Sequence, residues 1–113
     1  MRNELMNFMI REKLWENKKL ASCSRDARLT FLGILSVCVD FGWSPYLHQS
    51  FPSLKNRIYP FDDIPIAVFD RWIDELEKAG FIMIHREGFV EDDEMFLFIL
   101  DFDYYNLLVD LRG

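Results

Sequence analysis

The chain has 113 residues, half of them hydrophobic, with eleven Phe, four Tyr and three Trp, which predicts one domain with a core that needs neither disulfides nor metal. Its net charge of −6 at pH 7 argues against a general binder of polyanions, although a local basic patch is compatible with that charge. The two cysteines, Cys23 and Cys38, predict buried reduced thiols. The sequence shows neither a long apolar leader nor an apolar run of about 20 residues, so we expect a cytoplasmic protein with no membrane span.

In chain order, the first segment predicts a short strand over residues 8–10 and a short helix over residues 16–21. Ser24 is a favourable N-cap residue. The apolar run after it predicts a largely buried helix over residues 25–40, and Gly42 ends that helix.

Residues 43–60 contain Pro45, Pro52 and Pro60, and they predict a loop with one short helix over residues 53–58. The acids and the proline of residues 62–65 predict the start of a further helix. It runs to Ala79, and one apolar stripe predicts its buried face: Val68, Phe69, Trp72, Ile73 and Leu76. We expect Trp72 and Leu76 to pack against Phe31 and Leu35.

Two short apolar runs, residues 81–84 and 95–100, predict a β-hairpin around an acidic connection. The tail from residue 101 to 113 is compatible with a last short helix. The predicted order is therefore that of an α+β winged helix in a single domain over residues 1–113: a three-helix helix-turn-helix core, then a β-hairpin wing.

Two runs are moderately specific when they occur together: residues 24–29 (Ser-Arg-Asp-Ala-Arg-Leu) and residues 59–63 (Tyr-Pro-Phe-Asp-Asp). Further matching positions are Leu14, Trp15, Lys19, Leu20, Ala21, Phe31, Gly33, Asp40, Gly42, Leu54, Lys55, Ile58, residues 74–77 and 79–82, Asp101 and Phe102. Through these positions the sequence resembles the N-terminal winged-helix domain of phage and prophage replication initiators, the DnaD-like replisome organizers. The resemblance implies a winged-helix fold and a part in origin binding by phage replication machinery.

Charge is distributed unevenly along the chain, with nine Lys and Arg against five Asp and Glu in residues 1–60, and four against fourteen in residues 61–113. A phosphate backbone would be attracted by the first half and repelled by the second. The candidate DNA contacts are Lys55 and Arg57, which would flank the backbone, and Arg71, which would lie near a base edge. The alternative is that these cations belong to an ordinary solvated surface.

Two features favour a protein-binding module instead. Trp43 and Tyr46 lie in the proline-broken segment, where an exposed aromatic loop would suit a protein interface or a homodimer. The hairpin connection is acidic: Glu91, Asp92, Asp93 and Glu94. These carboxylates either keep a sheet edge soluble or, with acids of the preceding helix (Asp70, Asp74, Glu75 and Glu77), attract a basic protein partner and mimic DNA.

The sequence offers no pattern typical of catalysis. His48 and His85 are 37 positions apart and are not spaced with Cys or acids as metal ligands. No Gly-rich phosphate loop and no nucleophile elbow is present. We therefore expect no enzyme, no cofactor and no metal. The first hypothesis is a phage- or prophage-derived DNA-binding protein related to replication initiators, whose partner is duplex DNA; the second is an acidic interaction module, an inhibitor or DNA mimic on the same scaffold.

Overall fold

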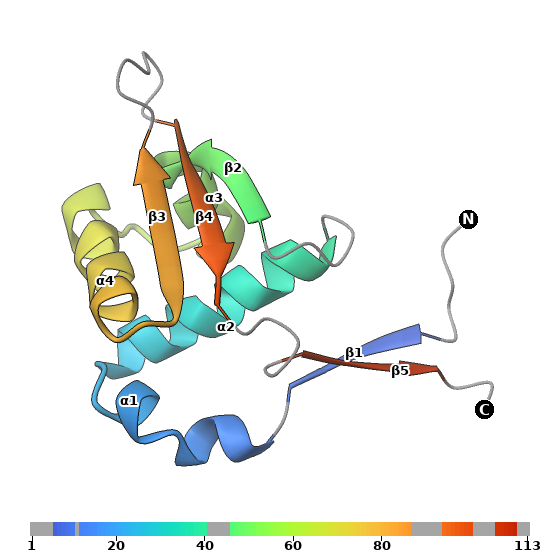
Figure 1. The fold of residues 1–113 in the computed structure, drawn as a ribbon. Coiled ribbons are helices and arrows are strands. Elements are labelled where there is room, and N and C mark those ends of the chain that lie inside the picture. Colours follow the sequence, from blue (N-terminus) through green and yellow to red (C-terminus); the bar gives the residue numbers. More distant parts are fainter. Residues whose placement is uncertain (1–5, 11, 41–45, 87–93, 101–105, 111–113) are drawn as a thin grey trace.

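The computed structural model describes residues 6–10, 12–40, 46–86, 94–100 and 106–110, with side chains described for residues 14–38, 46–85 and 95–100. The chain combines runs of helices with antiparallel sheets, so the fold is α+β (Figure 1). The helical elements are η1 (Glu12–Glu16, a 3-10 helix), α1 (Lys18–Ala21), α2 (Arg25–Asp40), α3 (Phe51–Ile58) and α4 (Ile66–Lys78). The strands are β1 (Met6–Ile10), β2 (Tyr46–Ser50), β3 (Ile82–Arg86), β4 (Glu94–Ile99) and β5 (Asn106–Asp110).

Local chemistry defines the start of α2 and the end of α4. The Ser24 hydroxyl accepts a hydrogen bond from the Ala27 N–H at 3.2 Å, so the predicted helix over residues 25–40 and its N-cap are confirmed as α2. Gly80 has φ of 89°, a left-handed conformation that ends a helix at little cost for glycine. The predicted stop of α4 is therefore also confirmed.

Helix α3 begins two residues earlier than the predicted residue 53. The Ser50 hydroxyl accepts from the Ser53 N–H at 3.2 Å, and Pro52 falls in the first turn, where its missing N–H leaves no intrahelical hydrogen bond unmade. Ser50 is thus the N-cap residue, and Phe51 becomes the first, buried helical residue.

The predicted hairpin is confirmed: β3 and β4 pair antiparallel, with Ile84 opposite Leu97. The prediction of a loop after residue 43 is wrong for residues 46–50, because β2 pairs antiparallel with β4 in a sheet of order β2-β4-β3. Pro45 and Pro52 flank the strand and do not interrupt its ladder. What appeared to be a proline-broken loop is therefore an edge strand.

The expected N-terminal strand is present as β1, but the expected C-terminal helix is wrong. Residues 106–110 form β5, which pairs antiparallel with β1 in a separate two-stranded sheet (Figure 1). Leucines three and four apart favour a helix on their own, whereas Leu107, Leu108 and Val109 also suit a strand once a partner is present. The pairing across the length of the chain decides the outcome.

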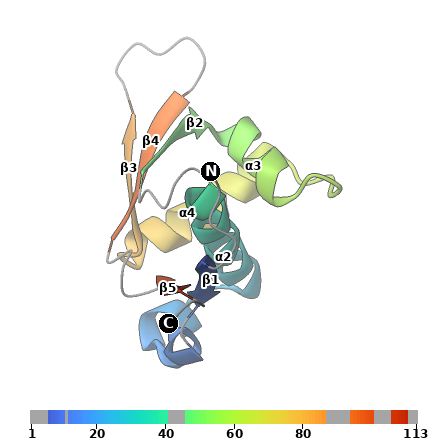
Figure 2. The same cartoon turned by 90° about the vertical axis from the view of Figure 1, so that its right-hand side faces the viewer.

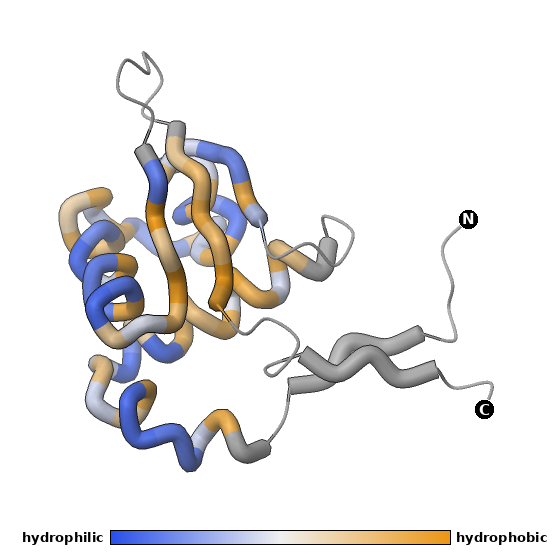
Figure 3. Tube along the Cα trace, viewed as in Figure 1, coloured by the Kyte–Doolittle hydropathy of each residue, from blue (hydrophilic) through white to orange (hydrophobic). Residues whose placement is uncertain are grey.

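One hydrophobic cluster joins the helices to the inner face of the three-stranded sheet, and its members with no more than 2% exposure include Phe31, Phe69, Leu76, Leu97 and Ile99. The helices lie on one side of that sheet (Figure 2). Hydropathy follows the same division, with hydrophobic residues concentrated along α2 and β4 (Figure 3). Three helices, a hairpin and a third strand make this arrangement compatible with a winged helix.

The inward packing expected of α4 is found for Leu76, which is fully buried together with Phe31 and Leu35. Trp72 differs from that expectation. It is only half-buried, and its ring lies 5.8 Å from the ring of Tyr59. Tyr59 is itself fixed in the core, since its hydroxyl lies 2.8 Å from that of the buried Thr30.

Candidate interaction surface

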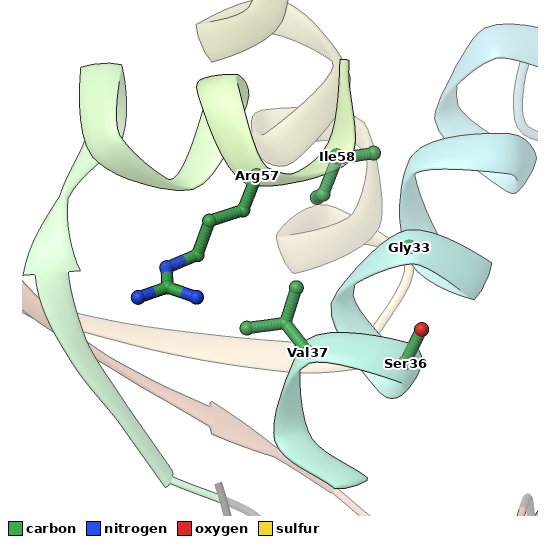
Figure 4. Close-up of a pocket in the computed structure, with 5 residues that line it drawn as sticks. All are labelled: Gly33, Ser36, Val37, Arg57 and Ile58. Carbon is green, nitrogen blue, oxygen red and sulfur yellow. The ribbon is translucent and has the colours of Figure 1, made fainter. Parts of the chain in front are cut away.

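The three predicted DNA-contacting residues lie on two consecutive helices. Lys55 and Arg57 occupy the last turn of α3, the former half-buried and the latter exposed, and Arg71 is exposed on α4. Arg57 extends from α3 toward Val37 on α2, beside a pocket of about 370 Å³ that is also lined by Gly33, Ser36 and Ile58 (Figure 4).

Arg71 lines a different depression, which it shares with Ser24, Trp72, Asp74 and Glu75. Arg57 shares its pocket with Gly33 of α2, and Arg71 shares its depression with Ser24, which precedes α2. Nine residues separate Gly33 from Ser24, which corresponds to about 14 Å along the axis of a helix. The structure therefore does not gather Arg57 and Arg71 into one basic pocket.

The acids of α4 that sequence analysis grouped with the hairpin connection have structural partners. Both carboxylate oxygens of Glu75 accept hydrogen bonds from Ser24, one from its N–H and one from its hydroxyl, each at 2.8 Å. Glu77 accepts from the Ile84 N–H at 3.1 Å. Asp74 binds Lys78 at 2.8 Å, which raises the pKa of Lys78. These contacts show that acids on α4 have structural roles within the fold, so their presence does not require a basic partner.

Most of the predicted acidic connection is not part of the described structure. Glu91, Asp92 and Asp93 lie outside the described residues, as does Trp43. Glu94 begins β4, and its side chain is not among those described.

Tyr46, by contrast, lies within the described residues, and it belongs to an exposed surface that the sequence did not predict. In β2 and β4 the buried residues alternate with more exposed ones: Leu47, Leu97 and Ile99 face the core, so the residues between them face outward. The outer residues of the three strands are Tyr46, His48, Met83, His85, Phe96 and Phe98. We call this set the aromatic face.

The aromatic face consists of two rows that cross the sheet. Phe98 of β4 stands opposite Tyr46 and Met83 in one row, and Phe96 stands opposite His48 and His85 in the other. Tyr46 is 57% and Met83 is 55% exposed, and Figure 2 shows the helices only on the opposite side of the sheet.

The rings of each row are in contact. The Tyr46 and Phe98 centroids are 4.5 Å apart at an interplanar angle of 82°, an edge-to-face pair. His48 stacks on Phe96 at 4.2 Å and 11°, and His85 approaches the same ring at 6.4 Å. Such contacts hold the rings in defined orientations, so the surface is ordered before any partner arrives.

Sequence analysis found only Tyr46 of this set, for two reasons. The continuous apolar run of residues 95–100 hides which residues face outward, and the flanking prolines concealed β2. Within Tyr46–Ser50 two apolar residues are followed by three polar ones, so this segment lacks the alternation that would have predicted a strand.

Neither cysteine has the environment of a reactive thiol. Burial raises the pKa of Cys38 to about 12. Burial, and then the nearby charge of Glu75, raise the pKa of Cys23. Activated cysteines shift in the opposite direction. Within the described part of the chain, no group of three or more His, Cys, Asp or Glu side chains is arranged to hold a metal ion, and no described helix has the length and apolar character to cross a bilayer.

Comparisons of the chain with known protein families, with curated proteins and with solved structures found no match.

Proposed function

We propose that this chain is a winged-helix domain that binds a protein partner through the aromatic face of its sheet. The winged-helix assignment is supported by the order of elements, in which α2, α3 and α4 are followed by the β3–β4 hairpin and β2 completes the sheet. The resemblance to phage replication initiators suggests the same scaffold.

The exposed rows of the aromatic face are the observation that carries the proposal. Aromatic residues and methionine are enriched in protein interfaces, and here five rings and a methionine share one side of a three-stranded sheet. A solvated sheet face usually carries polar residues that alternate with the core. The residues present are therefore better explained by a partner that covers them.

The charge of this face favours protein over nucleic acid. Proteins that stack bases on aromatic rings also supply a positive groove for the phosphates. None of the described side chains on the aromatic face is Lys or Arg. With a net charge of −6, the chain instead complements a partner whose surface is basic around an apolar centre.

The test is a double variant of the two most exposed members, Tyr46→Thr with Met83→Thr, because threonine keeps the strand propensity and removes the apolar area. The matched control is Leu29→Gln, which removes a hydrophobic side chain of 52% exposure from α2. Wild-type chain and control should bind the same protein from a lysate of the source cells, and the double variant should bind it at least about tenfold more weakly.

Equal binding of that protein by all three proteins would contradict the proposal. So would capture of nucleic acid alone. Light scattering of the wild type and of the double variant tests separately for a second copy on this face, because a dimer held there should be present in the first and lost in the second.

Duplex DNA binding remains the second candidate, and the composition of α3 is the observation that favours it. Its charged residues are Lys55 and Arg57, with no acid in the helix. If duplex DNA binds there, Lys55→Ala with Arg57→Ala should reduce the slope of log K against log salt by about 2.

The matched control for charge is Lys18→Ala with Lys19→Ala, since both lysines are exposed on α1. It should leave the slope unchanged. Absence of wild-type binding to duplex DNA at low salt would exclude this candidate.

A further inference from the structure

Phe61, in the connection between α3 and α4, is 98% exposed. Every other large hydrophobic side chain among the described residues keeps more contact with the protein; the next most exposed is Tyr46 at 57%. Phe61 therefore contributes almost no buried area to this fold.

The backbone on either side of Phe61 is held in place. Tyr59 is buried, its ring lies 6.4 Å from that of Phe69, and its carbonyl accepts from the Asp62 N–H at 3.4 Å. On the other side, Ile64 packs against the core cluster. Pro60 and Pro65 restrict the backbone further. The exposed ring is thus presented from a short segment fixed at both ends, which lowers the entropy lost when a partner orders it.

The sequence neighbours of Phe61 are acidic and apolar. Asp62 and Asp63 follow it and are exposed, and Ile66 at the start of α4 is 44% exposed. No Lys or Arg occurs from residue 58 to residue 70. A ligand for this segment would have to offer apolar area at its centre and positive charge at its edge.

We propose that Phe61 is an anchor that inserts into an apolar pocket of a partner protein whose rim carries Lys or Arg side chains opposite Asp62 and Asp63. The site is separate from the aromatic face, because the α3–α4 connection lies on the side of the helices away from the sheet (Figure 2). It stands whether or not the aromatic face binds a protein.

Charge favours a protein with a basic rim over nucleic acid or a second copy of this chain as the partner of Phe61. Aromatic side chains also wedge between bases, but two carboxylates next to the ring would repel the phosphates on either side. A second copy of the chain would bring the same acidic segment and a net charge of −6. A pocket with a basic rim satisfies both the ring and the carboxylates.

The first experiment replaces Phe61 with the photoreactive residue p-benzoylphenylalanine in the full chain and irradiates cells of the source organism. The same residue at Leu29, exposed on α2, is the control. A protein crosslinked from position 61 and not from position 29 is expected. Sequencing of the crosslinked peptide should place the attachment in an apolar segment with Lys or Arg nearby.

The crosslinked protein, purified, is then titrated with the full chain. Phe61→Ser should weaken binding at least tenfold, and Leu29→Ser should not change it. D62N/D63N should weaken binding at low salt and flatten its salt dependence. Since all four positions are exposed, the melting temperatures of these variants should match that of the wild type.

The proposal is overturned if position 61 crosslinks no protein beyond the control, or only a second copy or nucleic acid. It is equally overturned if Phe61→Ser binds the crosslinked protein as tightly as the wild type. An unchanged salt dependence in D62N/D63N would refute the basic rim. If the Tyr46→Thr and Met83→Thr double variant loses binding to the crosslinked protein and Phe61→Ser does not, the result supports the aromatic face and rejects the Phe61 anchor.

Discussion

Gly33 determines how closely α2 and α3 approach. A Cβ at this position would collide with Cγ2 of Ile58 and lie 3.0 Å from its Cγ1. We expect Gly33→Ala to destabilise the protein by about 1–3 kcal/mol, because overpacking between helices outweighs the gain of about 1 kcal/mol in helix propensity. Urea denaturation measures the change.

The control for Gly33 is Ile58→Ala, which removes the colliding atoms. The double variant should lose less stability than the sum of the losses in the two single variants, since the new methyl group occupies part of the space that Ile58 leaves. Strict additivity would show that the collision is relieved elsewhere.

The burial of Cys38 should make the free energy of unfolding depend on pH in the alkaline range. Its side chain is fully buried, and burial raises its pKa from 9.0 to about 12. The folded pKa is higher than the unfolded one, so this contribution to stability is complete below pH 9 and is lost as the pH rises toward 12.

The free energy of unfolding should therefore fall by about 2 kcal/mol between pH 8 and pH 10.5, as the thiol ionises only in the unfolded chain. Burial also raises the pKa of Tyr59, which adds a further loss above pH 10. Urea titrations at both pH values measure the fall. Cys38→Ala should show a smaller one, and a fall equal to that of the wild type would contradict the assignment.

At the scale of elements, Glu75 connects α4 to the first turn of α2. Its two hydrogen bonds with Ser24, each 2.8 Å, join residues that are far apart in the sequence. We expect Glu75→Ala to cost about 1–2 kcal/mol, and Ser24→Ala about 1 kcal/mol through loss of its cap to Ala27. Thermal denaturation of the single and double variants should give a coupling energy of at least about 0.5 kcal/mol.

A coupling energy near zero would show that Glu75 acts only as a surface acid. Lys78→Ala is the matched control on the same helix, because its ion pair with Asp74 is exposed on both sides. Exposed pairs contribute little to stability. It should change the melting temperature far less than Glu75→Ala.

At the scale of the whole molecule, one core joins the helices to the sheet. Leu76 is fully buried in it, and Leu76→Ala should cost about 2–5 kcal/mol through lost burial and a cavity. The far-UV circular dichroism and tryptophan fluorescence transitions should shift together, as expected for a two-state domain. A fluorescence shift without a matching dichroism shift would show that the helices and sheet unfold separately.

The distribution of exposed hydrophobic residues gives the molecule two separate candidate surfaces. The aromatic face lies on the outer side of the sheet, and the segment that holds Phe61 lies beyond the helices, on the far side (Figure 2). Because neither surface contributes much to the core, variants at both should bind more weakly without unfolding. The two proposals together predict that the domain contacts two partners at once.

The sequence by itself determined the elements whose ends depend on local chemistry. Ser24 and Gly80 act on their own neighbouring backbone, so α2 and the end of α4 were predictable from single residues. The hairpin was predictable because its two apolar runs are close in sequence. The burial of Leu76 followed from helical periodicity.

Only the tertiary structure decided what depends on distant pairing. Residues 46–50 and 106–110 become strands because β4 and β1 supply the hydrogen-bonding partners, and strand preference is set largely by such neighbours. The aromatic face exists only once the β2-β4-β3 register brings Tyr46, Phe98 and Met83 into one row. The exposure of Phe61 likewise depends on packing, because its sequence neighbours Tyr59 and Ile64 turn inward and leave its ring in solvent.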